Sequence, residues 1–146
     1  MATGFVHTYG PHALVAGGSY GLGAAFAEGI ARRGVNLVII ARNESQLTAT
    51  ADRLRATYGV NVIAVVADMA DFEDVRTQLS RLEVAIGLLV YDAAHAPIGR
   101  FEDVPEDQLA KAVSVNVRTP LLLAKLLSVP MIERGRGGIV LMSSLA

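Results

Sequence analysis

The sequence has no cysteine and almost no net charge, since 13 lysine and arginine residues are balanced by 14 aspartate and glutamate residues. Without cysteine, the chain can form neither a disulfide framework nor a thiolate metal site or nucleophile. A formal net charge of −1 gives no electrostatic footprint for nucleic acid or an acidic membrane surface. The three histidines, His7, His12 and His95, lack the spacing of metal ligands, so we predict no metal site.

Long apolar runs are also missing. No apolar run reaches the roughly 18 residues needed to span a bilayer. Residues 1–11 have neither the basic start nor the apolar stretch of a signal peptide. The 146 residues, 52 % of them hydrophobic, suffice for one domain with a buried core. A cytoplasmic location is therefore the default expectation.

The most informative segment covers residues 12–33. An apolar strand over 12–17 runs into a loop with glycines at 17, 18, 21 and 23, and the loop opens an amphipathic helix over 21–33. Glycines allow a sharp turn and a close backbone approach, and the free N–H groups at a helix start attract negative charge. The segment favours a site for a dinucleotide phosphate, and tight packing without a ligand is the alternative.

Strands and helices continue to alternate along the chain. The patterns predict an irregular lead-in over 1–11 and a loop over 92–103, strands over 35–41, 61–68, 84–91 and 138–143, and helices over 44–58, 72–82 and 105–134. Nearly continuous apolar strands alternating with helices indicate right-handed βαβ units. We therefore predict an α/β fold with an open, doubly wound parallel sheet and a ligand crevice at the carboxyl ends of its strands.

From residue 12 to residue 146 the chain resembles the short-chain dehydrogenase/reductase family. Four features carry the resemblance: Gly17-x-x-x-Gly21-x-Gly23, Asp68 at the end of the third strand, Val115-Asn116 in the long helix, and Ile139-Val-Leu-Met-Ser-Ser144. The resemblance implies a single Rossmann-like dinucleotide-binding domain over 1–146. Its five strands are expected in the order 3-2-1-4-5, without the family's C-terminal strands. It also implies hydride transfer between a nicotinamide cofactor and a small carbonyl or alcohol substrate, and assembly into homo-oligomers.

The same resemblance assigns the cofactor site. It implies backbone binding of the pyrophosphate along the glycine loop and contacts to the rest of the cofactor from three strand ends, by Gly17, Ser19, Tyr20, Gly21, Leu22, Gly23, Arg42, Asn43, Asp68, Met69, Ala93 and Ala94. An acidic residue after the second strand would bind the ribose hydroxyls of NAD. Here Ala41-Arg42-Asn43 stands there instead, and a guanidinium suits a 2′-phosphate, so we predict NADP over NAD. Alternatively, Arg42 is a solvated residue that opens the next helix, and Asp68 only caps a strand end.

Asn116 and Ser144 are the catalytic positions that the resemblance implies. Pro120 lacks the N–H that would bond the Asn116 carbonyl, which predicts a kinked helix with that carbonyl free. In the family this asparagine helps to hold a water in a proton relay, and the alternative is a kink that serves packing only. The family's serine positions the substrate carbonyl or hydroxyl. Otherwise Ser143 and Ser144 are ordinary turn residues.

The chain departs from the family pattern at two places. Its four tyrosines, at 9, 20, 58 and 91, and its lysines at 111 and 125 make no Tyr-x-x-x-Lys, the family's proton-transfer pair. We therefore expect almost no turnover from this chain alone, and we expect it to be the N-terminal part of a longer enzyme, because its fifth strand would be an apolar edge. Tyr91-Asp92-Ala93-Ala94 replaces Asn-Asn-Ala-Gly, and the Asp92 carboxylate can accept but not donate hydrogen bonds. The alternative function is a non-catalytic dinucleotide-binding or interaction protein.

Overall fold

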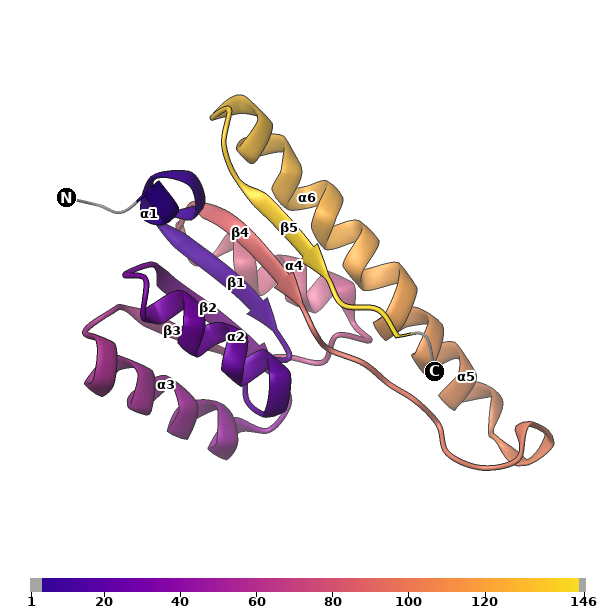
Figure 1. The fold of residues 1–146 in the computed structure, drawn as a ribbon. Helices are drawn as coiled ribbons and strands as arrows, with labels where there is room; N and C mark the ends of the chain where they lie inside the picture. The colour runs from indigo at the N-terminus through magenta and orange to yellow at the C-terminus, as the bar shows by residue number, and fades with distance from the viewer. Residues whose placement is uncertain (1–3, 145–146) are drawn as a thin grey trace.

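The computed structural model describes residues 4–144 and is organised around a five-stranded parallel sheet (Figure 1). The strand order is β3-β2-β1-β4-β5, which confirms the predicted order. The strands are β1 (His12–Ala16), β2 (Asn36–Ala41), β3 (Val62–Val66), β4 (Ile86–Tyr91) and β5 (Gly138–Leu141). The predicted fifth strand is too long, because β5 ends at Leu141 and Ser143 lies beyond it. A backbone bond from the Met142 N–H to the Tyr91 carbonyl continues that strand pairing.

Helices cover both faces of the sheet, as a doubly wound fold requires. The helices are α1 (Gly4–Tyr9), α2 (Gly21–Ala31), α3 (Glu44–Tyr58), α4 (Phe72–Ser80), α5 (Glu106–Val113) and α6 (Thr119–Glu133), with short 3₁₀ (Phe101–Asp103) and π-helical (Ser114–Arg118) segments. One face carries α2 and α3, and the other carries α4 and α6 (Figure 1).

Alternate residues of each central strand enter two separate hydrophobic cores. In β1, Val15 packs in the core beneath α2 and α3, whereas Leu14 packs in the core beneath α4 and α6, and both side chains are fully buried. Two-sided burial explains why these strands are almost continuously apolar. At the sheet edge, the β5 residues Ile139 and Leu141 are 39 % and 43 % exposed. This is the apolar edge strand that the sequence predicts.

The segment predicted to be an irregular lead-in contains the helix α1, so that prediction is wrong. This helix is only six residues long, too short to be stable by its own hydrogen bonds. The helix packs closely against the sheet. Gly87 of β4 lies so near the Tyr9 carbonyl oxygen that a Cβ atom at position 87 would be 2.4 Å from it. A contact between segments so distant in the chain leaves no local signal.

The predicted long helix is present as α5, the π-helical segment and α6. Thr119 donates its N–H to the Ser114 carbonyl, five residues back, immediately before Pro120. Where the sequence predicts a kink near Pro120, the helix contains a π turn and continues into α6. By length and composition alone, the continuous stretch Glu106–Glu133 could cross a membrane, and 28 % of its most apolar window is buried. The sequence still has no uninterrupted apolar run of that length, because polar residues such as Lys125 interrupt it.

Candidate functional site

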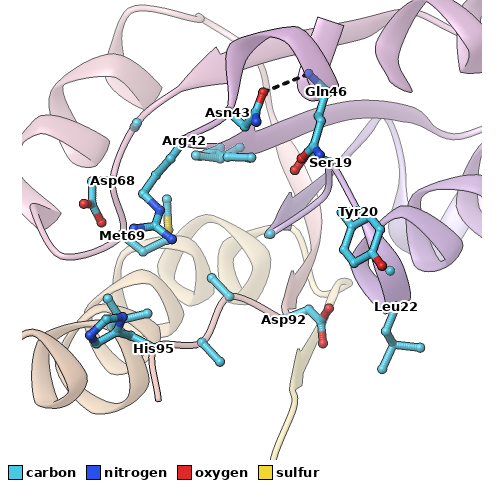
Figure 2. A pocket seen from close by; sticks show the side chains of 18 of the residues that line it. Ser19, Tyr20, Leu22, Arg42, Asn43, Gln46, Asp68, Met69, Asp92 and His95 are labelled. Atoms are coloured by element: carbon cyan, nitrogen blue, oxygen red, sulfur yellow. Dashed lines mark hydrogen bonds between the residues drawn. The ribbon is translucent and has the colours of Figure 1, made fainter. Parts of the chain in front are cut away.

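A cleft of about 800 Å³ lies at the carboxyl ends of the strands (Figure 2). Its walls come from the glycine turn after β1, the ends of β2, β3 and β4, and α5. Most of the residues predicted to bind a cofactor line it: Gly17, Ser19, Tyr20, Gly21, Leu22, Arg42, Asn43, Asp68, Met69, Ala93 and Ala94. Gly23, Asn116 and Ser144 do not line it. Folding therefore brings together residues that are separated by up to 77 positions in the chain.

The glycines of the turn serve two different purposes. A Cβ atom on Gly17, where φ is +83°, would lie 2.9 Å from the Ala93 nitrogen, and one on Gly23 would lie 2.0 Å from the Gly17 carbonyl oxygen. At these two positions close packing leaves no room for a side chain, because Gly17 lies against the backbone at Ala93 and Gly23 of α2 lies against the Gly17 carbonyl. At Gly21, where φ is +57°, an added Cβ atom would meet no other atom within 4 Å. That position leaves the approach to the start of α2 clear, as a bound phosphate would require.

Neighbouring elements fix the turn before any ligand arrives. The N–H groups of Gly17 and Gly18 both donate to the Ile40 carbonyl at the end of β2, at 2.9 and 3.3 Å. The Thr50 hydroxyl of α3 donates to the Ser19 carbonyl at 3.1 Å. A turn anchored to β2 and α3 presents its remaining backbone groups in a preorganised arrangement, which lowers the ordering cost of binding.

Arg42 and Asn43 follow β2 but have different roles. The Asn43 side chain accepts a hydrogen bond from the Gln46 N–H at 3.1 Å and caps α3 (Figure 2). Its oxygen is thus engaged by the protein itself. Arg42 is exposed and extends into the cleft on the side of Asp68 and Met69 (Figure 2). Of these two residues, Arg42 is the one that presents a cation to a ligand.

Asp68 forms an ion pair that sequence reasoning missed. One carboxylate oxygen accepts from the Ala70 N–H at 2.9 Å, and the other lies 2.9 Å from the Lys111 ammonium of α5. Burial raises the pKa of Asp68, but the Ala70 N–H and the Lys111 ammonium outweigh that effect and lower the pKa below its usual value. Asp68 is therefore a carboxylate whose charge is largely compensated within the protein.

Asn116 lies outside the cleft and binds the backbone of His95, which lines the cleft. Its side-chain oxygen accepts from the His95 N–H at 2.9 Å, and its amide donates to the His95 carbonyl at 2.8 Å. The His95 ring in turn lies 3.1 Å from the side-chain oxygen of Gln108. In the same region, the buried Tyr91 hydroxyl donates to the Val115 carbonyl within the π-helical segment. The loop after β4 is thereby attached to the long helix, and the Asn116 amide is used for that attachment.

Asp92, the residue that departs from the family pattern, accepts a hydrogen bond from the Gly23 N–H at the start of α2. Burial raises the pKa of Asp92, and the Gly23 N–H lowers it only in part, so the net pKa is raised. The carboxylate therefore connects β4 to α2 without needing to donate a hydrogen bond. Ser144 lies three residues beyond β5 and is exposed. Among residues 4–144, no group of three His, Asp or Glu side chains is arranged to hold a metal ion.

Comparison with known proteins adds to this geometry. The family model for short chain dehydrogenase matches residues 11–146. The chain is 34 % identical to "Inactive hydroxysteroid dehydrogenase-like protein 1" of Mus musculus and 34 % identical to "Very-long-chain 3-oxoacyl-CoA reductase" of Emericella nidulans, with 95 % of this chain and 43 % of each relative covered. It therefore spans less than half the length of these curated relatives.

Solved structures show the same relationship. A short-chain dehydrogenase from Sphingobium yanoikuyae in complex with NADPH superposes with a TM-score of 0.86 at 36 % identity, over 92 % of this chain and 54 % of that one. Its fold likeness and the family match agree with the glycine turn and strand order described above. This chain belongs to the short-chain dehydrogenase family.

Proposed function

We propose that this chain binds NADP(H) as the cofactor-binding portion of a short-chain oxidoreductase. The observation that carries the cofactor choice is the position of Arg42, a cation in the cleft at the end of β2 where an acidic residue would favour NAD. A guanidinium can bind a phosphate with two parallel hydrogen bonds. The related Sphingobium yanoikuyae structure contains NADPH, which supports the proposal by analogy.

The described residues fit such a cofactor in order along the cleft. The open space at Gly21 and the start of α2 would receive the pyrophosphate, Arg42 the adenosine 2′-phosphate, and Asp68 the adenine edge. The backbone at Ala93 and Ala94 also lines the cleft and would face the nicotinamide half. When bound, NADPH would supply the hydride for reduction of a carbonyl. The protein's own contribution here is to bind and orient it.

Asn116 and Ser144 are proposed to serve the reaction of the whole protein. Asn116 fixes the loop at His95 beside the cleft, and Ser144 follows the carboxyl end of β5, the strand next to β4. Residues 1–146 contain no Tyr-x-x-x-Lys pair, so for this chain by itself we propose cofactor binding with almost no turnover. The cytoplasmic location and the homo-oligomeric assembly stay predictions.

Titration with NADPH and with NADH, followed by nucleotide fluorescence, tests the proposal. We expect NADPH to bind more tightly. Arg42→Ala should weaken NADPH by about 10-fold or more, because a charged hydrogen-bond partner is lost, while NADH changes little. Arg81→Ala, at an exposed position outside the cleft, is the matched control and should change neither. Equal affinity for both nucleotides, or an equal loss of both in Arg42→Ala, would contradict the NADP assignment.

The second candidate is a non-catalytic dinucleotide-binding protein. Two observations favour it: the Asp92-Ala93-Ala94 departure and the word "Inactive" in the name of the Mus musculus relative. The two candidates predict different sequences after residue 146. A Tyr-x-x-x-Lys in the reading frame after residue 146, with carbonyl reduction by the extended protein, would support the enzyme, and its absence would support the binding protein. If a folded chain bound neither nucleotide, an interaction protein would become the better interpretation.

A further inference from the structure

Three charged side chains gather at the end of the cleft proposed for the adenosine. Arg42 follows β2, Asp68 follows β3, and Lys111 comes from α5. Lys111 and Asp68 form an ion pair at 2.9 Å, and the charge of Arg42 also acts on the Asp68 carboxylate. Figure 2 shows Arg42 and Asp68 on the same side of the pocket. Together the three groups carry one net positive charge.

An unpaired carboxylate here would oppose phosphate binding in two ways. It would repel the phosphate directly, and it would attract the Arg42 guanidinium away from it. In this structure each Asp68 oxygen already accepts one hydrogen bond within the protein, one from the Ala70 N–H and the other from Lys111. The side chains of Lys111 and Asp68 are 26 % and 36 % exposed. The pair is thus less screened than a fully exposed pair would be.

Lys111 is held at this distance by the way its helix is attached. The buried Thr119 hydroxyl donates to the Met69 carbonyl at 2.6 Å, one residue after Asp68. The buried Tyr91 hydroxyl donates to the Val115 carbonyl, one helical turn after Lys111. These two bonds fix the long helix against the ends of β3 and β4, so the ion pair is present before a ligand binds.

We propose that Lys111 is a positioning residue for cofactor specificity: it neutralises Asp68 and so leaves Arg42 available for the phosphate on the adenosine 2′ position. The inference rests on the proposed NADP function and deepens it. Lys111 acts through Asp68 rather than by touching the phosphate. Selection of NADP then depends on a charge from α5 as well as on the residue that follows β2.

Two small ligands isolate the 2′-phosphate: adenosine 2′,5′-bisphosphate and adenosine 5′-monophosphate. Calorimetric titration of the chain should show tighter binding of the bisphosphate. Lys111→Met is expected to weaken the bisphosphate about 10-fold, equivalent to about 1.4 kcal/mol, and the monophosphate by no more than about 2-fold. Lys111→Arg should retain the preference. Lys125→Met, at the only other lysine, exposed on α6 outside the cleft, is the matched control and should behave as wild type.

Removal of the carboxylate provides the decisive comparison. In the double variant Lys111→Met/Asp68→Asn, no negative charge needs neutralising, so the ratio of the two affinities should return to the wild-type value. A double variant that stays as weak as Lys111→Met would show direct phosphate contact and overturn the proposal. An equal loss of both ligands in Lys111→Met would show a merely structural role and would also overturn it.

Other outcomes separate this proposal from the one on which it rests. Asp68→Asn alone, which leaves Lys111 in place, should keep the preference for the bisphosphate at or above that of wild type, and a reduced preference would overturn the proposal even if Lys111→Met failed to fold. If wild type prefers the bisphosphate but Lys111→Met does so equally, only the role of Lys111 fails. If the folded wild-type chain binds neither ligand, the NADP function fails, and this inference fails with it.

Discussion

Replacing Gly23 by alanine places a methyl group 2.0 Å from the carbonyl oxygen of Gly17. Contacts of a Cβ atom below 3.0 Å essentially never occur, so either α2 or the glycine turn has to move. The turn cannot yield easily, because the Gly17 N–H is bonded to Ile40 of β2 and Gly17 packs closely against the backbone at Ala93, in the loop after β4. The Gly23 N–H would also shift away from the Asp92 carboxylate that accepts it.

The expected magnitude follows from two opposing contributions. Overpacking against fixed backbone costs about 3 kcal/mol, whereas alanine in place of glycine within a helix contributes about 1 kcal/mol of stability. The net loss is about 2 kcal/mol, or about 6 °C in Tm for a chain of this length. Because the displaced turn also lines the cleft, NADPH affinity should fall by at least about 10-fold.

Urea unfolding followed by circular dichroism measures the first effect, and NADPH titration measures the second. Gly29→Ala in the same helix is the matched control, since a Cβ atom there meets only the end of the flexible Arg33 side chain, at 3.6 Å. That variant should be as stable as wild type or more so, by up to about 1 kcal/mol. A Gly23→Ala protein with wild-type stability and NADPH affinity would refute the steric reasoning.

Two further predictions concern the buried Tyr91 and the half-buried Asp92. Tyr91→Phe keeps the ring but leaves the Val115 carbonyl without its hydroxyl partner, so the free energy of unfolding should fall by about 1–2 kcal/mol in urea titrations; an unchanged value would mean that this carbonyl finds another donor. Burial raises the pKa of Asp92 above 3.8, so folding favours the protonated form, and stability is lost as pH rises from the unfolded pKa through the raised folded one. Asp92→Asn should therefore be more stable than wild type at about pH 7, and the difference should shrink towards about pH 3. Unfolding curves at both pH values measure this difference. A wild type that is more stable than Asp92→Asn at about pH 7 would contradict the prediction.

The strands and most helices could be predicted because their signals are local. The helix α3 begins and ends where its apolar face predicts, at Glu44 and Tyr58, because Asn43 caps its start and Gly59 adopts the left-handed conformation at its end. The buried strands are recognisable because two-sided burial requires apolar residues at almost every position. The length of β5 was overestimated because an apolar run continues past the last strand pairing.

Candidate site residues on the glycine turn and at the strand ends could also be named, because parallel strands bring their carboxyl ends to one edge. The role of each side chain is harder to predict from the sequence than its place at the site. Asn43 turned out to cap a helix, and Asn116 turned out to bind the backbone of His95, outside the cleft itself. Both residues are polar and suitably placed, and only their neighbours in space determine which hydrogen bonds they make.

The sequence alone determined the alternation of strands and helices, the glycine turn and the cation at the end of β2, since each depends on residues that are neighbours in the chain. The tertiary structure decided the helix α1, the π-helical turn and the partner of Asp68. Asp68 and Lys111 are 43 residues apart, and whether their charges cancel depends on a separation of 2.9 Å. Electrostatic energy depends on distance in space, and only the packing of α5 against the end of β3 sets that distance.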